Sequence, residues 1–522
     1  RAVLLFQPGE DYICALAGCW YAGVVAVPVY APRANDSFER IRLIVADAKA
    51  GAILMTSRSI AALQASGWQA GPIQVIATDT LEADPDDWSM PQIGPDTLAV
   101  LQYTSGSTGV PKGVRLAHRH LLTNSRMIQS SAGTNEDSVG VFWLPPYHDM
   151  GLIGGILQPF YAGFPTRLMS PATFLRRPLL WLEAISRYRG TVSAAPNFAF
   201  ELCTKRARPE QIASMDLSRW ELVVNGAEPV RAESMRRFAQ VFAPSGFRAR
   251  TFFPSYGMAE TTLFVSGQSF GDHMVSLRAS REALAEGRIV SANGAGAPDP
   301  ASAIELVACG APNPEVEVRI VDPHTGAACP AGSVGEIWIH GDTVADGYWD
   351  REEESERTFR ARMAGDERGW LRTGDLGALH EGRLYITGRT KDLIIIRGNN
   401  HYPHDIEATV LLAHPAIRPG GAAAFALTDG DGAEALGLVV EIDRGWNGEA
   451  DGAGFDAVAR AVRDAVSRRH QLQVERLAFV RANSIPKTSS GKVQRYLARQ
   501  HLLTGKITEL DKDVLDATAI AS

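Results

Sequence analysis

The sequence predicts an α/β protein with more than one domain, and three observations support this. Across residues 24–100, short apolar runs such as residues 52–55 alternate with helical stretches, which indicates a parallel sheet covered by helices. Residues 315–322 and 335–341 alternate with a period of two, which predicts antiparallel strands in a smaller β subdomain. At 522 residues, the chain also exceeds what a single hydrophobic core usually serves.

The composition argues against several classes of function. The net charge of −7 and the absence of a long basic run argue against nucleic acid as a partner. The five cysteines are scattered and include no CxxC pair, which favours a reducing compartment and argues against a zinc site or a disulfide framework. We therefore expect a cytoplasmic protein.

One uncharged segment, residues 12–32, is long enough to suggest a membrane span. Glycines and prolines interrupt this segment. We therefore expect no membrane span, but a packed helix over residues 11–21 and a buried strand over residues 24–29.

The segment Tyr-Thr-Ser-Gly-Ser-Thr-Gly-Val-Pro-Lys-Gly, at residues 103–113, has the composition of a phosphate-binding loop. Glycines let backbone N–H groups approach an anion, hydroxyls donate further hydrogen bonds, and the lysine adds a positive charge. The spacing is not that of a Walker loop. We expect the loop to join strands at residues 97–103 and 113–116, ahead of a helix near residues 118–127; the alternative is a plain Gly/Ser turn. The candidate phosphate-binding residues are Thr104, Ser105, Gly106, Ser107, Thr108, Gly109 and Lys112.

This loop resembles that of the adenylate-forming superfamily, which includes acyl-CoA synthetases, amino-acid adenylation domains, luciferases and fatty acyl-AMP ligases. The resemblance covers nearly the whole chain. It implies a large N-terminal domain, residues 1–390, of two stacked α/β subdomains plus a small β subdomain. A small mobile α+β C-terminal domain, residues 391–522, would follow a hinge at Lys391 or Asp392. Family members carry a further strand and helix ahead of residue 1, so we expect an incomplete N-terminus or a chain cut from a longer polypeptide.

In residues 143–155, His148 and Asp149 stand at the start of an apolar, glycine-rich helix. Asp149 could simply cap that helix. Residues 143–155 and 193–200 also resemble fatty acyl-AMP ligases most, which implies that His148 lies near the reacting carboxylate and that small residues leave room for an acyl chain. The implied acyl-pocket residues are Asp149, Met150, Gly154, Asn197 and Phe198. For residues 193–200, a core helix is the alternative.

Two further segments, residues 222–229 and 253–262, place polar turns after buried strands, where ligands collect in α/β proteins. An ordinary strand-to-helix turn is the alternative for the first. In the second, Tyr256 can stack on adenine, and Glu260 can hold Mg²⁺ through its carboxylate oxygens. Amino-acid adenylation domains usually have Asn where Pro254 stands, which puts that function in doubt. The implied nucleotide contacts are Asn225, Gly226, Ala227, Ser255, Tyr256, Gly257 and Met258.

The C-terminal third of the chain contains three more candidate site residues. Asp375 can accept both ribose hydroxyls and Arg389 can reach the ribose or the α-phosphate, although the two could also form a structural salt bridge. Lys492 stands in a Ser/Gly-rich loop, residues 484–495, and would by itself be only an exposed lysine. Because Lys492 follows the other motifs in order, the resemblance implies that it is the catalytic lysine of the family.

Residues 276–303 contain few large apolar side chains and predict one short helix, near residues 280–286, followed by loops. The extra length resembles the insertion of fatty acyl-AMP ligases, which in that family is taken to hinder the domain rotation needed for CoA transfer. A surface loop without function is the alternative.

The resemblance implies a ligase that converts a long-chain fatty acid and ATP, with Mg²⁺, to an acyl-adenylate and pyrophosphate. The implied catalytic residues are Lys492, Glu260 and His148. The acyl group would then pass to the phosphopantetheine thiol of an acyl carrier protein, or of a carrier domain in a polyketide or nonribosomal peptide synthase. A fatty acyl-CoA synthetase is the first alternative; an amino-acid adenylation domain and a catalytically inactive scaffold follow.

Overall fold

The computed structural model describes residues 1–31, 38–69, 71–82, 84–104, 111–292, 303–428, 434–446, 454–488 and 491–510. The chain forms two compact units. Unit 1 consists of Arg1–Val275, Val307–Arg319 and Trp338–Thr373, and unit 2 of Ser276–Leu306, Ile320–Ile337 and Gly374–Ser522. The expected domain boundary after residue 390 stays a prediction.

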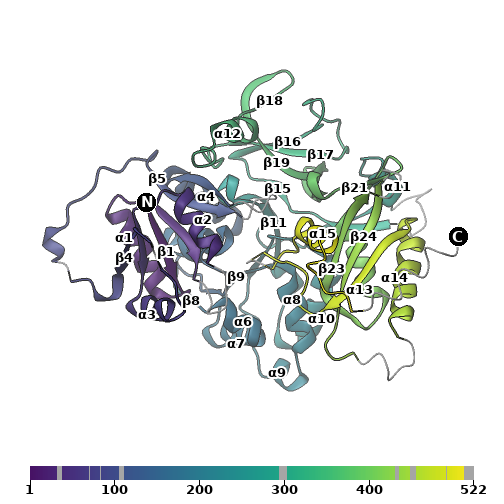
Figure 1. The fold of residues 1–522 in the computed structure, drawn as a ribbon, viewed down its shortest axis with the longest axis horizontal. Helices are drawn as coiled ribbons and strands as arrows, with labels where there is room; N and C mark the ends of the chain where they lie inside the picture. The colour runs from purple at the N-terminus through teal and green to yellow at the C-terminus, as the bar shows by residue number, and fades with distance from the viewer. Residues whose placement is uncertain are drawn as a thin grey trace. The chain divides into compact units, whose positions relative to one another are not determined.

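The first sheet of unit 1 has six strands in the order β4-β3-β1-β2-β5-β6, and it forms the purple and blue part of the chain in Figure 1. Its strands are β1 (Ala2–Phe6), β2 (Ala26–Tyr30), β3 (Ala52–Met55), β4 (Gln74–Ala77), β5 (Leu98–Thr104) and β6 (Lys112–Ala117). Its helices are α1 (Glu10–Tyr21), α2 (Glu39–Asp47), α3 (Ser57–Ala65) and α4 (His118–Ala132). All its pairings are parallel except β5–β6. The predicted alternation of strands and helices is confirmed.

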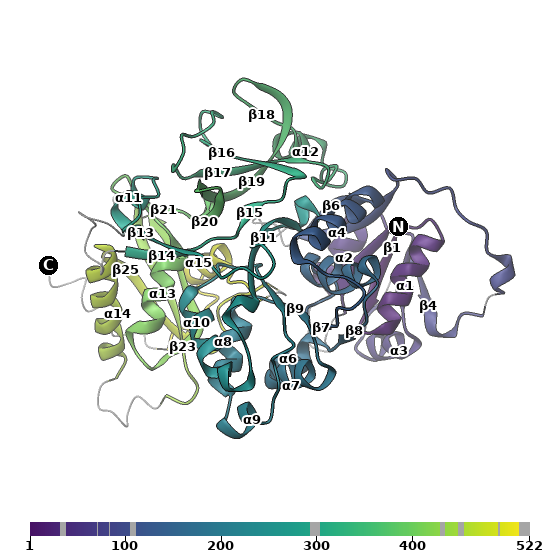
Figure 2. The ribbon, with the colours of Figure 1, turned by 180° about the vertical axis from the view of Figure 1, so that it is seen from behind.

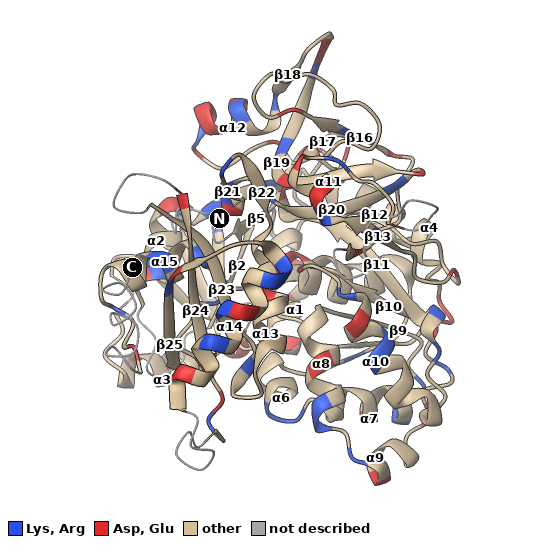
Figure 3. Cartoon of the chain, turned by 90° about the vertical axis from the view of Figure 1, so that its right-hand side faces the viewer, with Lys and Arg blue, Asp and Glu red and all other residues tan. Residues whose placement is uncertain are grey.

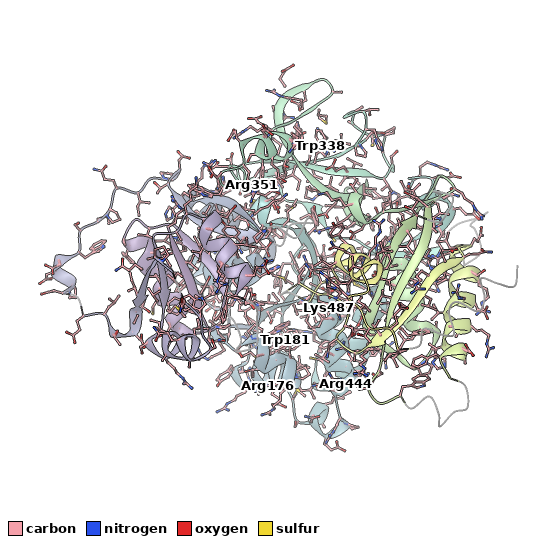
Figure 4. All side chains as sticks on the ribbon, viewed as in Figure 1. Arg176, Trp181, Trp338, Arg351, Arg444 and Lys487 are labelled. Atoms are coloured by element: carbon pink, nitrogen blue, oxygen red, sulfur yellow. The ribbon has the colours of Figure 1, made fainter. Side chains whose placement is uncertain are left out.

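The second sheet of unit 1 has seven strands in the order β15-β12-β11-β10-β9-β7-β8. Its strands are β7 (Gly140–Phe142), β8 (Thr166–Leu168), β9 (Val192–Ala195), β10 (Leu222–Asn225), β11 (Phe252–Gly257), β12 (Phe264–Gly267) and β15 (Ala311–Pro312). Its helices are the π-helix η3 (Met150–Leu157), α5 (Gln158–Ala162), α6 (Pro171–Arg176), α7 (Leu179–Tyr188), α8 (Asn197–Arg206), α9 (Pro209–Ala213) and α10 (Ala232–Phe242). Figure 2 shows α8 and α10 side by side. Trp181, labelled in Figure 4, is fully buried and packs its ring edge-on against Trp220 and Phe200 in an aromatic core.

Residues 12–32, which raised the question of a membrane span, divide between α1 and β2 as predicted. Across the described parts of the chain, every helix is too short or too polar to traverse a bilayer.

The predicted small β subdomain is a five-stranded sheet. Its strands are β16 (Val316–Val321), β17 (Gly335–Gly341), β18 (Ala361–Met363), β19 (Asp366–His380) and β20 (Arg383–Arg389), in the order β16-β17-β19-β18 with β20 paired to β19. Helix α12 (Glu352–Phe359) precedes β18. The period-two prediction for residues 315–322 and 335–341 is therefore confirmed.

The predicted insertion begins with a strand that the sequence analysis did not anticipate. Strand β13 (Ser276–Ser280) pairs with β14 (Ala303–Val307), and the predicted short helix is present as α11 (Arg281–Ala285). The prediction of helix and loops alone was wrong because a short polar strand is stabilised by its partner, which here lies more than twenty residues further along the chain.

Two side-chain contacts within unit 2 join the insertion to the segment around α13 (Pro403–Ala413). The Arg281 guanidinium forms a largely buried ion pair with Asp405, with Nη2 donating to Oδ1 at 3.0 Å. The Tyr402 hydroxyl donates to the carbonyl oxygen of Leu284 at 3.3 Å. The helix of the insertion is therefore bonded to the beginning of α13 by both charge and hydrogen bonding.

The C-terminal part of unit 2 is built on the sheet β23-β24-β25. Its elements are β21 (Ile394–Ile396), β22 (Asn399–His401), α13, β23 (Ile417–Thr428), β24 (Glu434–Ile442), α14 (Gly454–His470), β25 (Val474–Arg481) and α15 (Arg495–Leu503). Ala422 and Ala424 join a core with α13 and α14, whereas Ala423 and Phe425 join a second core with α15. The alternation follows from the two-residue period of a strand, and Figure 1 shows α14 and α15 on opposite sides of the sheet. The strands predicted around residues 420–437 are confirmed as β23 and β24, and residues 429–433 between them lie outside the described residues. The second predicted stretch, residues 445–454, lies mostly outside them, and its last residue, Gly454, is the first residue of α14.

Helix α14 carries its charges on the exposed face. Arg460, Asp464 and Arg468 follow one another at intervals of four residues, so opposite charges are neighbours, and Figure 3 shows basic and acidic bands along this helix. This spacing of opposite charges stabilises the helix locally. The exposed face of α14 therefore carries both positive and negative charges.

His120 makes the stability of unit 1 depend on pH. It is buried at the start of α4, and its Nδ1 accepts the N–H of Ala117 at 2.9 Å. Burial, together with neighbouring Arg119, lowers its pKa from 6.5 to about 4, against the opposing charges of Asp346, Asp342 and Asp96. The folded state therefore holds His120 neutral. The stabilisation is complete above the unfolded pKa of 6.5 and is lost as the pH falls toward 4.

We expect the free energy of unfolding to fall with decreasing pH in this window, with His120 contributing at most about 1.4 kcal/mol per pH unit. Urea unfolding at steps between about pH 7 and about pH 4 measures this slope. His120→Asn should show a shallower slope than the unchanged protein, whereas His324→Asn, at an exposed histidine, should not. Equal slopes for His120→Asn and the unchanged protein would contradict the assignment.

Candidate active site

The predicted phosphate loop joins two antiparallel strands, as expected. Thr104, the last residue of β5, is paired with Lys112, the first residue of β6. Residues 105–110, which include five of the predicted phosphate-binding residues, lie outside the described residues. The structure therefore brings the two ends of the loop together at Thr104 and Lys112.

Lys112 is held by two groups that the sequence analysis missed. Its Nζ forms an ion pair with Glu354 on α12 and lies 5.2 Å from the ring centroid of Tyr348. Only 13% of the Lys112 side chain is exposed, so the carboxylate and the ring face stabilise a cation that has little contact with water. In the sequence, Glu354 belongs to a run of three glutamates, which is more typical of a solvated helix face.

The two segments assigned to the nucleotide end on neighbouring parallel strands. Asn225 at the end of β10 is in register with Pro254 of β11. A Cβ added to Gly226 would lie 3.1 Å from the Ser255 hydroxyl oxygen, and one added to Gly257 would collide with the backbone of Leu263. The predicted segments 225–227 and 255–258 therefore lie together, and close packing leaves no room for a side chain at Gly257.

Asn225 and Tyr256, in these two segments, are buried, which limits the groups that their side chains can contact. Asn225 is fully buried, and its amide nitrogen lies 2.9 Å from the sulfur of Met235 in the core. Tyr256 lies near the end of β11 and is mostly buried. Two residues later, the backbone of Met258 is extended. Their adenine contacts stay predictions.

A strained turn directly follows Glu260. The N–H of Leu263 donates to the carbonyl of Thr261 at 2.8 Å, closing a three-residue turn in which Thr262 has φ 69° and ψ −61°. This conformation is rare for a β-branched residue and is found mainly at functional sites. The Thr262 hydroxyl stabilises it by donating to the Thr343 carbonyl at 2.9 Å.

Glu260 is the only residue that we predicted to hold Mg²⁺. It is 9% exposed, and its Oε1 accepts the Tyr348 hydroxyl at 2.9 Å. In the parts of the chain that the structure describes, no three His, Cys, Asp or Glu side chains are grouped as metal ligands. A single oriented carboxylate nevertheless fits Mg²⁺, because this ion usually takes one or two carboxylates and completes its shell with water and substrate phosphates.

Asp149 is the N-cap of the π-helix η3. This confirms the alternative role considered for Asp149, that of capping the helix. Its Oδ1 accepts the N–H of Met150 at 2.7 Å and lies 2.5 Å from Nδ1 of His148. The glycines of this π-helix do not all leave space: a Cβ on Gly151 would lie 2.0 Å from the carbonyl oxygen of Pro145, whereas one on Gly154 would make only ordinary contact. The proposed room for an acyl chain therefore excludes Gly151, and the role of His148 stays a prediction.

Asn197 and Phe198 begin α8. The Asn197 amide donates to Glu201 at 2.9 Å and accepts the N–H of Arg231 at 3.0 Å, so it fastens α8 to the segment before α10. The Phe198 ring stands edge-on to Trp143 at 6.1 Å. Both residues support the aromatic core, and their acyl-pocket roles stay predictions.

In unit 2, Asp375 and Arg389 are paired across β19 and β20. Nε of Arg389 donates to Oδ1 of Asp375 at 2.8 Å, so the salt bridge considered as the alternative is present. The Asp375 side chain is 8% exposed and that of Arg389 57%. The arginine therefore reaches solvent while the carboxylate is held in a fixed orientation, and their nucleotide contacts stay predictions.

Lys492 is presented by a closed turn. Its N–H donates to Oγ1 of Thr488 at 3.0 Å, and its carbonyl accepts the N–H of Thr488 at 2.8 Å. Gly491, at φ 89°, adopts a backbone conformation that favours glycine. At the predicted hinge, Lys391 and Asp392 form a 3₁₀ turn, and Asp392 accepts from Arg495 at 2.8 Å.

The fold and the order of these groups define an enzyme of the AMP-binding class. The sequence model of the AMP-binding enzymes matches residues 1–349, and that of the Disco-interacting protein 2-like AMP domain matches residues 391–512. The medium-chain-fatty-acid–[acyl-carrier-protein] ligase JamA of Moorena producens is 43% identical over 98% of this chain and 87% of its own. A 4-hydroxyphenylalkanoate adenylyltransferase of Mycobacterium marinum is 38% identical over 98% of this chain and 83% of its own.

The structure also matches a solved fatty acyl-adenylate ligase from L. pneumophila, in complex with acyl adenylate and pyrophosphate. The TM-score is 0.73 with 39% identity, covering 96% of this chain and 86% of that chain. The chain therefore belongs to the AMP-binding enzyme family and, within it, to the fatty acyl-AMP ligases.

Proposed function

We propose that the protein activates a fatty acid with ATP and transfers the acyl group to the phosphopantetheine thiol of an acyl carrier protein. The observation that carries this proposal is the full set of ATP-directed side chains in a chain of this family: Lys112 and Glu260 in unit 1, and Asp375, Arg389 and Lys492 in unit 2. A catalytically inactive scaffold would not need to retain this set.

In the first step, a carboxylate oxygen of the fatty acid attacks the α-phosphorus of ATP. The bond from phosphorus to the β-phosphate bridging oxygen breaks, and pyrophosphate leaves with its electron pair. No general base is required, because the acid is already ionised near neutral pH. When bound, Mg²⁺ at Glu260 would supply charge neutralisation for the leaving pyrophosphate.

The protein's own cations would complete that neutralisation. Lys112 would release Glu354 and bind phosphate oxygens, since these carry the same kind of charge as the carboxylate. Arg389 would contact the ribose or α-phosphate beside Asp375, and Lys492 would stand between the two reacting anions. In the second step, the carrier thiolate attacks the acyl carbonyl carbon, and the bond to the AMP oxygen breaks.

The choice of carrier protein over CoA rests on the relatives' names and on the insertion. The name of JamA specifies an acyl carrier protein as its acceptor. The Arg281–Asp405 ion pair supports an insertion that restrains the C-terminal part, as the family resemblance implies. The acid itself is less defined, because relatives of similar identity are named for medium-chain fatty acids and for 4-hydroxyphenylalkanoates.

A screen of fatty acids of graded chain length tests the proposal. Each acid is offered with Mg²⁺-ATP, and hydroxylamine traps the adenylate; CoA and a phosphopantetheinylated carrier protein are then offered as acceptors. We expect hydroxamate for a subset of acids and thioester on the carrier only. Thioester on CoA at equal rate would favour the acyl-CoA synthetase, and no hydroxamate with any acid would overturn the proposal.

Breaking the insertion contact should relax the choice of acceptor. Arg281→Met removes one partner of a largely buried ion pair, a change that typically costs about 3–5 kcal/mol. We expect thioester formation on CoA to rise about tenfold relative to hydroxamate formation, because the restraint on the C-terminal part is weakened. Arg288→Met, at an exposed arginine of the same insertion, is the matched control. An unchanged ratio in Arg281→Met would remove this contact from acceptor choice.

A further inference from the structure

The segment Thr343–Trp349, here called the linking segment, is bonded to both halves of the phosphate site in unit 1. On one side it pairs with β6, which directly follows the phosphate loop: the N–H of Trp349 donates to the Gly113 carbonyl at 2.8 Å, and that of Arg115 to the Gly347 carbonyl at 3.0 Å. These two hydrogen bonds flank an antiparallel bridge between Val114 and Tyr348, which holds the segment beside β6.

On its other side, the linking segment contacts the turn that carries Glu260. The N–H of Ala345 donates to the Glu260 carbonyl at 2.9 Å, and the Thr343 carbonyl accepts the Thr262 hydroxyl at 2.9 Å. The segment therefore joins the backbone at Lys112 to the backbone at Glu260.

Tyr348, in this segment, contacts both functional side chains. Its hydroxyl donates to Oε1 of Glu260 at 2.9 Å, and its ring lies 5.2 Å from Nζ of Lys112. In this contact the phenol hydroxyl is the donor and the carboxylate oxygen of Glu260 is the acceptor. One buried ring thus touches the residue for the metal and the residue for the phosphates.

The position of Tyr348 is itself fixed from the side of α12. Its backbone N–H donates to the Ser355 hydroxyl at 2.9 Å, and its ring packs edge-on against Phe359 at 5.0 Å. Arg351, labelled in Figure 4, binds Asp47 at 2.8 Å and holds the start of α12 against the end of α2. The hydrogen bond to Ser355 and the ring contact with Phe359 leave the Tyr348 hydroxyl little freedom to leave Glu260.

We propose that Tyr348 is a positioning residue for adenylation, orienting the Glu260 carboxylate for Mg²⁺ and supporting the Lys112 ammonium for the ATP phosphates. This inference rests on the proposed function. A hydrogen bond to a carboxylate restricts its rotation, and the cation–ring contact holds the lysine ammonium in place without pairing it with an opposite charge.

Tyr348→Phe tests the inference because it removes the hydroxyl and keeps the ring. Tyr12→Phe is the matched control, since its buried hydroxyl donates to the Pro146 carbonyl at 2.8 Å and contacts neither Glu260 nor Lys112. Fatty-acid-dependent ATP–pyrophosphate exchange is measured over a range of Mg²⁺ concentrations. Calorimetry measures ATP binding with Mg²⁺ and with EDTA, and thermal unfolding measures the structural cost in both variants.

We expect Tyr348→Phe to raise the half-saturating Mg²⁺ concentration about tenfold, the effect of losing one hydrogen bond to a charged group. ATP affinity should fall with Mg²⁺ present and stay unchanged in EDTA. Tyr12→Phe should lower the unfolding temperature comparably but leave the Mg²⁺ dependence as in the unchanged protein.

An unaltered Mg²⁺ dependence in Tyr348→Phe, or an equal loss of ATP affinity with and without Mg²⁺, would overturn the inference. Failure of the proposed function has a different signature: the unchanged protein would then show no exchange with any fatty acid. The calorimetric comparison still decides the role of Tyr348 in that case.

Discussion

Lys492→Ala is expected to abolish acyl-adenylate formation while leaving the fold intact. The carboxylate and the α-phosphate are both anionic, and two such charges about 4 Å apart repel by about 4 kcal/mol at an effective dielectric constant of 20. Without the lysine, the rate should fall by about a thousandfold. The two hydrogen bonds between Lys492 and Thr488 use the Lys492 main chain and the main chain and hydroxyl of Thr488, all of which Lys492→Ala leaves in place.

Fatty-acid-dependent ATP–pyrophosphate exchange and hydroxamate trapping measure this loss, and circular dichroism verifies folding. Lys506→Ala removes an exposed lysine from the same unit and serves as the control, with exchange close to that of the unchanged protein. If Lys492→Ala retained full exchange, Lys492 would have no part in the chemistry.

Asp375→Asn should weaken ATP use without changing the shape of the site. The carboxylate can accept both ribose hydroxyls, and hydrogen bonds to a charged group contribute about 1.5–3 kcal/mol each. The amide replaces one acceptor oxygen with a donor and ends the ion pair with Arg389. We therefore expect kcat/KM for ATP to fall by about a hundredfold or more, mostly through KM.

Steady-state exchange at varied ATP, together with calorimetric AMP binding, measures this effect. Glu381→Gln makes the equivalent change at an exposed carboxylate in the turn between β19 and β20, and it should leave KM for ATP unchanged. Normal ATP and AMP binding by Asp375→Asn would assign the Asp375–Arg389 pair a purely structural role.

Much of the fold was predictable because its signals are local. The apolar runs at β3 and β4, the period of two in β16 and β17, and the packed helix α1 are each set by neighbouring residues and are confirmed. Strand β13 was missed because its stability comes from β14, whose sequence position gives no local signal.

The residues of the candidate site also fall into two groups, those that short motifs predict and those that only the structure reveals. Short motifs predicted functional roles for Lys112, Glu260, Asp375, Arg389 and Lys492, because these residue types suit the chemistry of ATP. The motifs could not identify Tyr348 or Glu354, which lie more than two hundred residues after Lys112 and look like an ordinary aromatic residue and a solvated charge.

By itself, the sequence determined the α/β class, the order of the motifs and the resemblance to fatty acyl-AMP ligases, since each depends on residues close together in the chain. Only the tertiary structure decided that Tyr348 joins Lys112 to Glu260 and that Arg281 bonds the insertion to α13. The physical reason is that hydrogen bonds, ion pairs and ring contacts act over a few ångströms of space, and folding alone determines which distant residues come within that range.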